Sequence, residues 1–302
     1  MTNVMRAFLK RSLPGPVRAI LRALLHYSQR LARWPVILWQ IRGVSLADEL
    51  ALIRSAFAAP ILGLRNLQQW QDPILLQDVA VRVLGVGQFS LRAYTDDLWH
   101  VLPWRERSIA ELMKGVLKPG DTFIDAGANI GVYTVLASRL VGPEGKVISV
   151  EMMPDTAERL ESHIHMNHLE NVTLIRRALS DVPGKTVTAT VQAGKHGQAT
   201  IATDTGRYGL GREIQVQTTT LDTITEHIPA VRLMKIDVEG AELQALQGGN
   251  VLLHKIDGLV YESWGWRRAV SDPVSTLLEG SGFTLHGLDG NNWLAEKSRQ
   301  DG

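Results

Sequence analysis

The strongest constraint on the fold is an alternation of short apolar runs with amphipathic segments, which begins at residue 122 and continues almost to the end of the chain. Short apolar runs predict buried strands, and apolar residues at helical spacing predict helices. Because parallel neighbouring strands need a crossover connection, this order favours a parallel sheet covered by helices. The expected strands are 122–126, 146–151, 172–178, 233–237 and 258–262, and the expected helices are 133–140, 156–168, 241–246 and 274–279.

Two segments depart from this alternation. Residues 186–220 alternate Val, Thr and Gln around several glycines, which predicts an inserted hairpin or an irregular flap. Residues 283–286 and 292–295 predict a closing antiparallel pair. We therefore expect an α/β fold with a mostly parallel seven-stranded sheet and an antiparallel last strand.

The residues before the sheet have a different character. The first 47 residues carry eight basic side chains and no acidic one, and the rest of the chain has 24 basic against 31 acidic residues. From Pro16 onward, apolar residues recur on one helical face and Arg18, Arg22 and Arg33 on the other, which predicts an amphipathic basic helix. We divide the chain into a basic helical leader (1–47), a helix and β-hairpin extension (48–104) and an α/β domain (105–302).

The extension carries its own local signals. Ser45 and Asp48 are spaced as a capping box for a helix over residues 45–58, and we expect Pro60 and Gly63 to end that helix. Alternating apolar residues over 79–92 predict a hairpin. A further helix is expected over 105–117.

The sequence leaves three interpretations of the leader open. On an anionic membrane surface, each basic residue could contribute about 1 kcal/mol of binding. The helix could instead dock on the α/β domain with its basic face in water, or belong to an organelle transit peptide. Its longest uncharged stretch, residues 34–41, is much shorter than the roughly 20 residues that cross a bilayer. We expect a cytoplasmic protein whose only membrane contact is peripheral, through residues 1–47.

The first candidate site follows strand 122–126, at the end where open parallel sheets bind ligands. Gly127 allows a tight turn beside a ligand, and Gly131 allows close packing of helix and strand. A dinucleotide fingerprint would need glycine where Asn129 stands. Asp125 suits a positively charged ligand better than a phosphate. The loop therefore fits S-adenosylmethionine, which has no phosphate and carries an ammonium and a sulfonium.

The next two strands end in further polar residues. Glu151 lies 26 positions after Asp125, where a carboxylate can accept hydrogen bonds from a ribose diol, although it could also be a solvated cap of the following helix. Ser180 and Asp181 follow the third strand and could contact an adenine ring, or form an ordinary turn.

A fourth loop, Lys235-Ile-Asp-Val-Glu-Gly-Ala-Glu242, completes a distinctive set of motifs. Together with Phe123-Ile-Asp-Ala-Gly-Ala-Asn-Ile-Gly-Val-Tyr-Thr134 and Thr220-Leu-Asp222, it resembles the FkbM family of methyltransferases. The resemblance covers about residues 75–297 and leaves the basic leader uncovered. It implies a Rossmann-like class I methyltransferase fold, S-adenosylmethionine as cofactor, and methyl transfer to a hydroxyl of a carbohydrate, glycolipid or secondary metabolite.

The resemblance also implies roles for individual residues. Asp125, Gly127, Asn129 and Gly131 match the family's cofactor loop, and Glu151 matches its ribose-binding acid. The acidic motif expected beside the transferred methyl group is Asp237, Glu239 and Glu242. This chain departs from the family at Met152 and Met153, where relatives commonly carry an aromatic residue, so we expect its packing over the ribose to differ from that in relatives.

Methyl transfer to a hydroxyl needs a group that accepts the hydroxyl proton. We predict Asp237 or Glu239 as this base; three histidines are less suitable because none stands at a strand end (His227, His254 and His286). Asp237, Glu239 and Glu262 could instead hold magnesium, but we expect no metal, since exposed loop acids are more common. Trp264 and Trp266 could form a platform for a sugar or simply belong to the core.

Other functions fit the sequence less well. The chain has no cysteine, which excludes thiolate catalysis and disulfides. A nicotinamide-dependent oxidoreductase or epimerase is disfavoured by Asn129 and by the absence of a Tyr-x-x-x-Lys run. A membrane-associated adaptor with an inactive methyltransferase fold is disfavoured by the intact cofactor motifs. An acidic body without an Asn-Pro-Pro-aromatic run argues for a small-molecule or glycan acceptor and against nucleic acid. The oligomeric state is not predicted.

Overall fold

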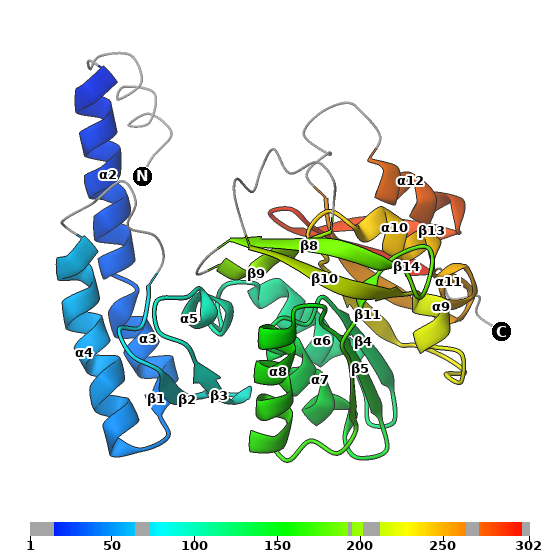
Figure 1. Ribbon diagram of the computed structural model, residues 1–302, viewed down its shortest axis with the longest axis horizontal. Helices are drawn as coiled ribbons and strands as arrows, with labels where there is room; N and C mark the ends of the chain where they lie inside the picture. Colours follow the sequence, from blue (N-terminus) through cyan, green and yellow to red (C-terminus); the bar gives the residue numbers. More distant parts are fainter. Residues whose placement is uncertain (1–14, 64–72, 193–194, 202–211, 264–271, 298–302) are drawn as a thin grey trace. The chain divides into compact units, whose positions relative to one another are not determined.

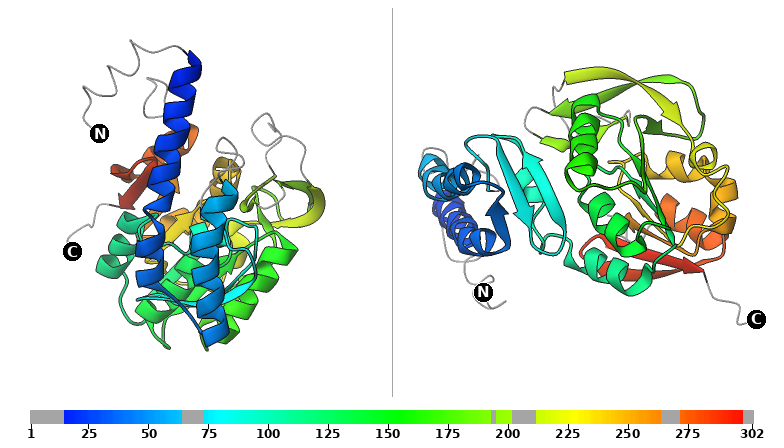
Figure 2. Two further views of the ribbon diagram at one scale, coloured as in Figure 1. Left: turned by 90° about the vertical axis from the view of Figure 1, so that its left-hand side faces the viewer. Right: turned by 90° about the horizontal axis from the view of Figure 1, so that it is seen from below.

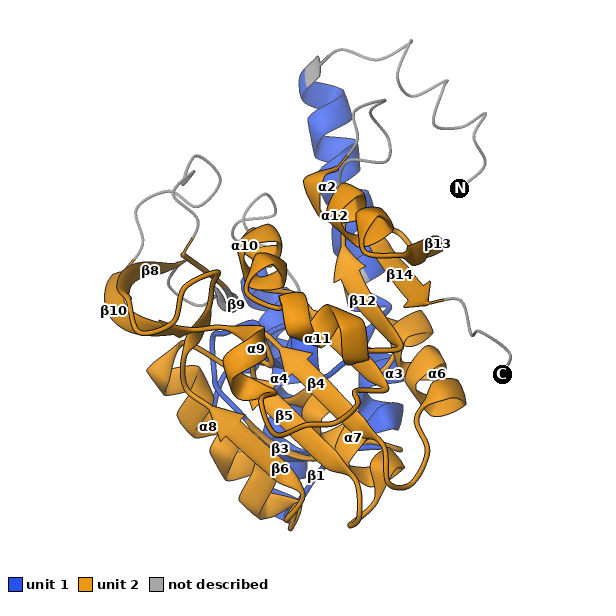
Figure 3. Cartoon of the chain, turned by 90° about the vertical axis from the view of Figure 1, so that its right-hand side faces the viewer, with its two compact units in different colours: residues 1–84, 91–102 blue, residues 85–90, 103–302 orange. Residues whose placement is uncertain are grey.

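The computed structural model describes residues 15–63, 73–192, 195–201, 212–263 and 272–297. The chain divides into two compact units (Figure 3). Unit 1 comprises residues 1–84 and 91–102, and unit 2 comprises residues 85–90 and 103–302. The described helices include none that is long and apolar enough to cross a membrane.

Unit 1 consists mainly of helices. The basic helix expected from the leader is α2, Gly15–Leu31, and it is followed by α3, Trp34–Gln40, and α4, Leu46–Gly63. Strand β1, Ile41–Gly43, pairs antiparallel with β2, Val79–Val83. A short helix α5, Asp97–His100, closes the unit, and the buried Asp97 carboxylate accepts hydrogen bonds of 2.7 and 2.8 Å from Arg92.

Helix α4 begins as predicted and ends later than predicted. The Asp48 carboxylate accepts the backbone N–H of Ser45, and the Ser45 hydroxyl accepts the N–H of Asp48, so the capping box is confirmed. The prediction that Pro60 ends the helix is wrong, because α4 continues through Pro60 to Gly63. Pro60 removes one backbone hydrogen bond of the helix, but it is buried together with Ala59 and Gly63, and this packing offsets the loss.

Unit 2 is built on the expected seven-stranded sheet, whose order is β13-β14-β12-β11-β4-β5-β6. Strands β11, β4, β5, β6 and β12 are parallel, whereas β14 runs antiparallel to β12. The mostly parallel sheet with an antiparallel last strand is therefore confirmed. The strands are β4 (Thr122–Ala126), β5 (Lys146–Val150), β6 (Val172–Ile175), β11 (Leu233–Ile236), β12 (Gly258–Glu262), β13 (Phe283–Asp289) and β14 (Asn292–Lys297).

Helices cover both faces of this sheet (Figures 1 and 2). Consecutive strand residues pack on opposite sides: Phe123 joins a core with α6 and α7, and Ile124 joins a core with α10, α11 and α12. This alternation explains why most residues of the parallel strands are apolar. The helices are α6 (Arg107–Val116), α7 (Val132–Val141), α8 (Pro154–Met166), α9 (Leu221–Ile224), α10 (Glu242–Gln247), α11 (Asn250–Lys255) and α12 (Pro273–Gly280).

The inserted segment forms a second sheet, of four strands in the order β7-β10-β8-β9. Strands β8 (Thr186–Gln192) and β9 (Lys195–Thr200) pair antiparallel, as the predicted hairpin requires, and β10 (Arg212–Thr219) lies beside β8. The predicted third strand of the main sheet is partly wrong. Strand β6 ends at Ile175 and is followed by two exposed arginines, Arg176 and Arg177. The next two residues form β7 (Ala178–Leu179), which pairs with β10 of the second sheet.

Candidate active site

The loop after β4 and the loop after β11 touch through Gly127. Gly127 has φ of +81°, and a Cβ built on it would lie 1.9 Å from the carbonyl oxygen of Asp237. Only glycine permits both this backbone conformation and this approach. Asn129 is also left-handed, with φ of +50°, as is Glu239 in the facing loop, with φ of +51°. Such conformations are uncommon for residues with a side chain and are often found at functional sites.

Asp125 lies beneath the loop, at the end of β4. It is fully buried, and its Oδ2 accepts a 2.7 Å hydrogen bond from the Thr134 hydroxyl, which also contacts the Ser149 hydroxyl. The other carboxylate oxygen, Oδ1, is buried without a hydrogen-bond partner among the described residues. Burial raises the pKa of Asp125, although Lys235 on the neighbouring strand acts against this. A buried, incompletely paired carboxylate contributes negative potential below the loop.

Glu151 follows β5 and supports the loop after β4 through a hydrogen bond to its backbone. Its Oε2 accepts the backbone N–H of Asn129 at 2.9 Å, and its Oε1 accepts that of Met153 at 2.8 Å. Burial raises the pKa of Glu151 from 4.5 to about 7, and these two backbone hydrogen bonds oppose the rise. The carboxylate therefore changes its charge near neutral pH and still has lone pairs for a ligand.

The third set of site residues follows β11. Asp237 Oδ2 lies 2.9 Å from Lys235 Nζ, and Glu239 accepts a hydrogen bond from the Thr200 hydroxyl through its carbonyl oxygen. Glu242 turns back and accepts the backbone N–H groups of Val238 and Gly240, so its carboxylate supports the loop from the first turn of α10. Burial raises the pKa of Glu242.

These loops surround one depression with about 490 Å³ of empty space, part of it open to solvent. Predicted site residues Gly127, Asn129, Glu151, Asp237 and Glu239 are brought together in its lining. Other described residues complete it: Val150, Met152, Arg177, Ala178, Leu179, Ala199, Ile201, Val238 and Ala241.

Five predicted residues lie outside the lining, and one of them is Glu242, whose carboxylate supports the loop instead. Asp125 lies below the lining, and Gly131 packs against Leu160, whose Cδ1 would be 2.2 Å from a Cβ at that position. Ser180 and Asp181 hydrogen-bond to each other, just beyond the two residues of β7 that do line the depression.

The sequence interpretation overlooked a buried polar chain behind Asp237. Lys235 is buried in β11, and its Nζ lies 5.2 Å from the ring centroid of Tyr133, whose hydroxyl donates to Glu106. Burial acts to lower the pKa of Lys235, but the carboxylates of Asp237, Glu106 and Asp125 raise it overall. Lys235 is thus a fixed cation beside Asp237. The available signal was a lysine within a strand that is otherwise apolar and buried on both faces.

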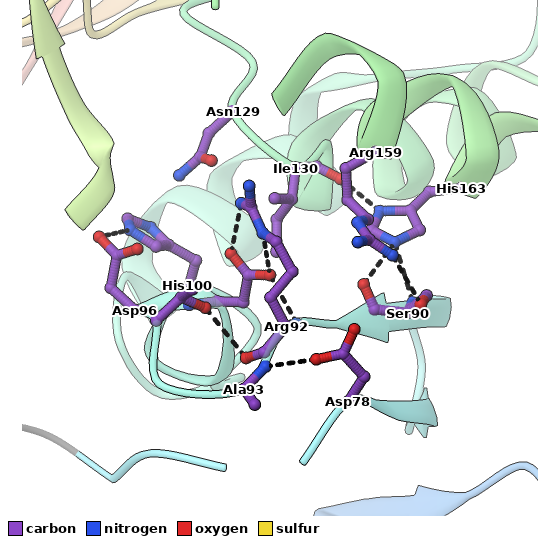
Figure 4. Close-up of polar contacts among 12 residues, drawn as sticks. Asp78, Ser90, Arg92, Ala93, Asp96, His100, Asn129, Ile130, Arg159 and His163 are labelled. Carbon is purple, nitrogen blue, oxygen red and sulfur yellow. Dashed lines mark hydrogen bonds and ion pairs between the residues drawn. The ribbon is translucent and has the colours of Figure 1, made fainter. Parts of the chain in front are cut away.

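A second overlooked residue is His163, which is fully buried in α8. Its Nδ1 lies 2.7 Å from the Ile130 carbonyl in the loop after β4, and its Nε2 accepts the backbone N–H of Ser90 at 2.9 Å (Figure 4). The histidine ties the loop to residues 87–90 of β3 (Gly87–Leu91). Its position on the apolar face of the predicted helix, beside Leu160 and Ile164, was the signal for burial.

We expect replacement of His163 by phenylalanine to lower the free energy of unfolding by roughly 2–4 kcal/mol, because the Ile130 carbonyl and the Ser90 N–H lose their partner. Urea denaturation measures this change. His165→Phe is the matched control, since His165 is exposed on the same helix and should change stability by less than about 0.5 kcal/mol. Equal stability of the two variants would contradict the role given to His163.

The remaining candidates stay apart from the depression. His227, His254 and His286 do not line it, and neither does Glu262. Within the described ranges, no three His, Asp or Glu side chains lie close enough to hold a metal ion together. Trp264 and Trp266 lie outside the described residues.

Comparison with known proteins adds an independent observation. Residues 125–267 match the model of the methyltransferase FkbM domain. Methyltransferase sdnD of Sordaria araneosa is 26% identical over 197 residues, which cover 55% of this chain and 75% of that protein. Hexuronic acid methyltransferase AglP of Haloferax volcanii is 24% identical over 207 residues, covering 66% and 82%. Methyltransferase 1 of Beauveria bassiana is 27% identical over 192 residues, covering 55% and 74%.

Proposed function

Since residues 125–267 are an FkbM-family domain and the chain is an S-adenosylmethionine-dependent methyltransferase, we propose that it methylates a hydroxyl group of a carbohydrate, a glycolipid or a secondary metabolite. Support for a sugar acceptor comes from the hexuronic acid methyltransferase among its relatives. We further propose that the acceptor is not a nucleic acid. The enzyme acts in the cytoplasm, with peripheral membrane contact through residues 1–47.

The observation that carries this proposal is the set of acidic groups around a glycine bend. Glu151 and Asp237 line the same depression, and Asp125 lies buried below it with Oδ1 lacking a partner among the described residues. A cationic nucleoside without phosphate fits these groups, whereas a pyrophosphate would meet negative charge. Asn129 Oδ1 is a further buried acceptor without a partner in the described part of the chain.

We assign the roles as follows. Glu151 accepts the ribose hydroxyls, and Gly127, Asn129 and Gly131 shape the loop that holds the nucleoside. Ser180 and Asp181 directly follow Ala178 and Leu179, which line the depression, and would contact the adenine from there. Asp125 supplies negative potential from beneath the loop.

When bound, S-adenosylmethionine supplies a methyl group on a positively charged sulfur. Asp237 accepts the hydroxyl proton of the acceptor, and Glu239 orients that hydroxyl. Lys235 fixes the direction of the Asp237 carboxylate through their 2.9 Å contact.

The direct test is transfer of a labelled methyl group to acceptor panels of hexuronic acid glycans, glycolipids and hydroxylated metabolites. A methyl ether resists mild alkali and a methyl ester does not, so alkali treatment of the product separates hydroxyl from carboxyl acceptors. Asp237→Asn should lower the transfer rate by roughly 10²-fold or more while leaving adenosylhomocysteine affinity within a few-fold. An alkali-labile product would overturn the hydroxyl assignment. Undiminished methyl transfer by Asp237→Asn would show that Asp237 is not the catalytic base.

Glu151 makes cofactor binding depend on pH. Its pKa is about 7, and only the carboxylate accepts both ribose hydroxyls, so affinity for adenosylhomocysteine should fall by up to about tenfold per pH unit below 7. Titration calorimetry between pH 5.5 and 8 measures this change in affinity, and Glu151→Gln should flatten the profile.

The stability of the ligand-free protein should depend on pH in the opposite direction, so the contribution of Glu151 to the free energy of unfolding should fall as the pH rises. A raised pKa means that Glu151 favours the folded state below about pH 4.5, and this contribution is lost as the pH rises through 7.

A further inference from the structure

Exposed apolar side chains are concentrated in unit 1. Among the described residues, seventeen large hydrophobic residues are exposed, and sixteen of them lie between Val17 and Tyr94. Unit 2 contributes only Val251 to this set. Scattered exposed apolar residues are ordinary on soluble proteins, but a concentration on one part of the chain indicates an interaction surface.

Helix α4 carries an ordered stripe of these residues. Leu46, Leu50, Phe57 and Ile61 are between 58% and 77% exposed. Their separations of four, seven and four residues place them on one face of the helix, over a length of about 22 Å. The opposite face is already packed, since Ala51, Leu52, Ser55, Ala56 and Ala59 are buried. The stripe is therefore additional to the face that the fold uses.

Helix α2 presents a second apolar face next to basic residues. Its exposed apolar residues include Val17, Ile20, Leu21 and Leu24. The Tyr27 hydroxyl donates a 3.0 Å hydrogen bond to the Pro60 carbonyl, which ties α2 to α4 inside the same unit. The two helices lie side by side in Figures 1 and 2.

The positive charge of residues 1–47 indicates that the partner surface is anionic. Residues 1–47 contain eight basic side chains and no acid, so the leader repels cationic surfaces and attracts anionic ones. Exposed Trp39 and Phe57 belong to the residue types that settle at the boundary between lipid headgroups and acyl chains. A basic helix with an exposed apolar face, too short and too charged to span, is typical of an interfacial anchor.

We propose that the apolar stripe of α4 and the exposed apolar face of α2 together form a docking surface for an anionic phospholipid bilayer. This extends the proposed contact through residues 1–47 to a second helix that carries no net basic charge of its own. The leader supplies electrostatic attraction, and both helices insert apolar side chains at the headgroup boundary. Binding should therefore weaken with salt but persist in part, because salt screens the attraction between charges but does not screen the burial of apolar side chains.

The test is sedimentation of the full chain with vesicles of phosphatidylcholine alone or mixed with phosphatidylglycerol. The wild-type protein should bind the mixed vesicles at least about tenfold more strongly. The double variant Leu50→Gln, Phe57→Gln should lose at least about tenfold in partition coefficient. Val251→Gln is the matched control, since it removes an exposed apolar residue of unit 2 and should leave binding unchanged. Arg18→Gln with Arg22→Gln should reduce the salt dependence.

Three results would overturn this inference: no binding to anionic vesicles, equal binding by the stripe variant, or a stripe-dependent dimer in solution that does not bind vesicles. The last would identify a second copy of the chain as the occupant. Adenosylhomocysteine affinity is measured on the same samples. A wild-type protein that binds adenosylhomocysteine but no vesicles would refute only the proposed docking surface. A wild-type protein that does not bind adenosylhomocysteine would refute the proposed enzymatic function instead.

Discussion

Replacement of Gly127 by alanine should destabilise the protein by roughly 3 kcal/mol and abolish measurable adenosylhomocysteine binding. The added Cβ would lie 1.9 Å from the Asp237 carbonyl oxygen, so the loops after β4 and β11 must separate. The left-handed backbone at φ +81° adds strain for any residue with a side chain. Both loops line the proposed nucleoside site, so their separation changes its shape. Urea denaturation and titration calorimetry measure the two effects.

Gly184 provides the matched control for this prediction. It has a similar φ of +76°, but a Cβ there would meet nothing within 4 Å. Gly184→Ala should therefore cost only the backbone strain, roughly 1 kcal/mol, and leave ligand affinity unchanged. If the two variants lose equal stability and both retain ligand binding, the close contact between the two loops is not important for the site.

Replacement of Glu151 by alanine should weaken adenosylhomocysteine binding by roughly 100-fold or more, and 100-fold corresponds to about 2.7 kcal/mol. Hydrogen bonds to a charged acceptor contribute about 1.5–3 kcal/mol each, and the ribose diol would lose two. The variant also leaves the N–H groups of Asn129 and Met153 without their acceptor, so the loop loses support. Titration calorimetry at pH 8, where Glu151 is ionised, measures the change in affinity.

Two companion variants separate binding from loop support. Glu151→Gln keeps the side-chain volume and one acceptor oxygen, so it should lose less affinity than alanine and retain most of the stability. Glu161→Ala is the control, because Glu161 is an exposed acid on α8 that pairs with Arg176 away from the depression. Unchanged affinity in Glu151→Ala would remove the ribose role from this residue.

Most of the main sheet could be predicted because its strands are buried on both faces. Most of residues 122–126 and 233–236 are apolar, since Phe123 and Ile124 each meet a separate layer of helices. Such runs stand out against the helices that connect them. The site loops were also predictable, because parallel strands deliver their following residues to a common edge.

The predicted strand 172–178 could not be placed correctly from local sequence, because its last residue belongs to another sheet. Ala178 and Leu179 continue the apolar character of β6, but they pair with Thr218 and Thr219 of β10, 40 positions further along the chain. Local sequence does not reveal which distant strand competes for the same segment. The same limit applies to Pro60, whose helix-breaking tendency is overcome by burial within unit 1.

The contacts between side chains in the site could not be predicted from the sequence either. Lys235 and Asp125 are 110 positions apart, yet strand register places them directly opposite each other on β11 and β4. The sequence indicated that Asp237 is acidic and follows a strand. It did not indicate that a buried lysine, supported by Tyr133 and Glu106, fixes that carboxylate in place.

A crystal structure of the full chain with adenosylhomocysteine tests the central claim most directly. We predict that the nucleoside lies in the depression formed by Gly127, Glu151 and Asp237, with both ribose hydroxyls within hydrogen-bond distance of the Glu151 carboxylate. The sulfur should face the loop that begins at Asp237. A ligand bound elsewhere on the chain, or a ribose that contacts neither Glu151 oxygen, would contradict the site proposed for this methyltransferase.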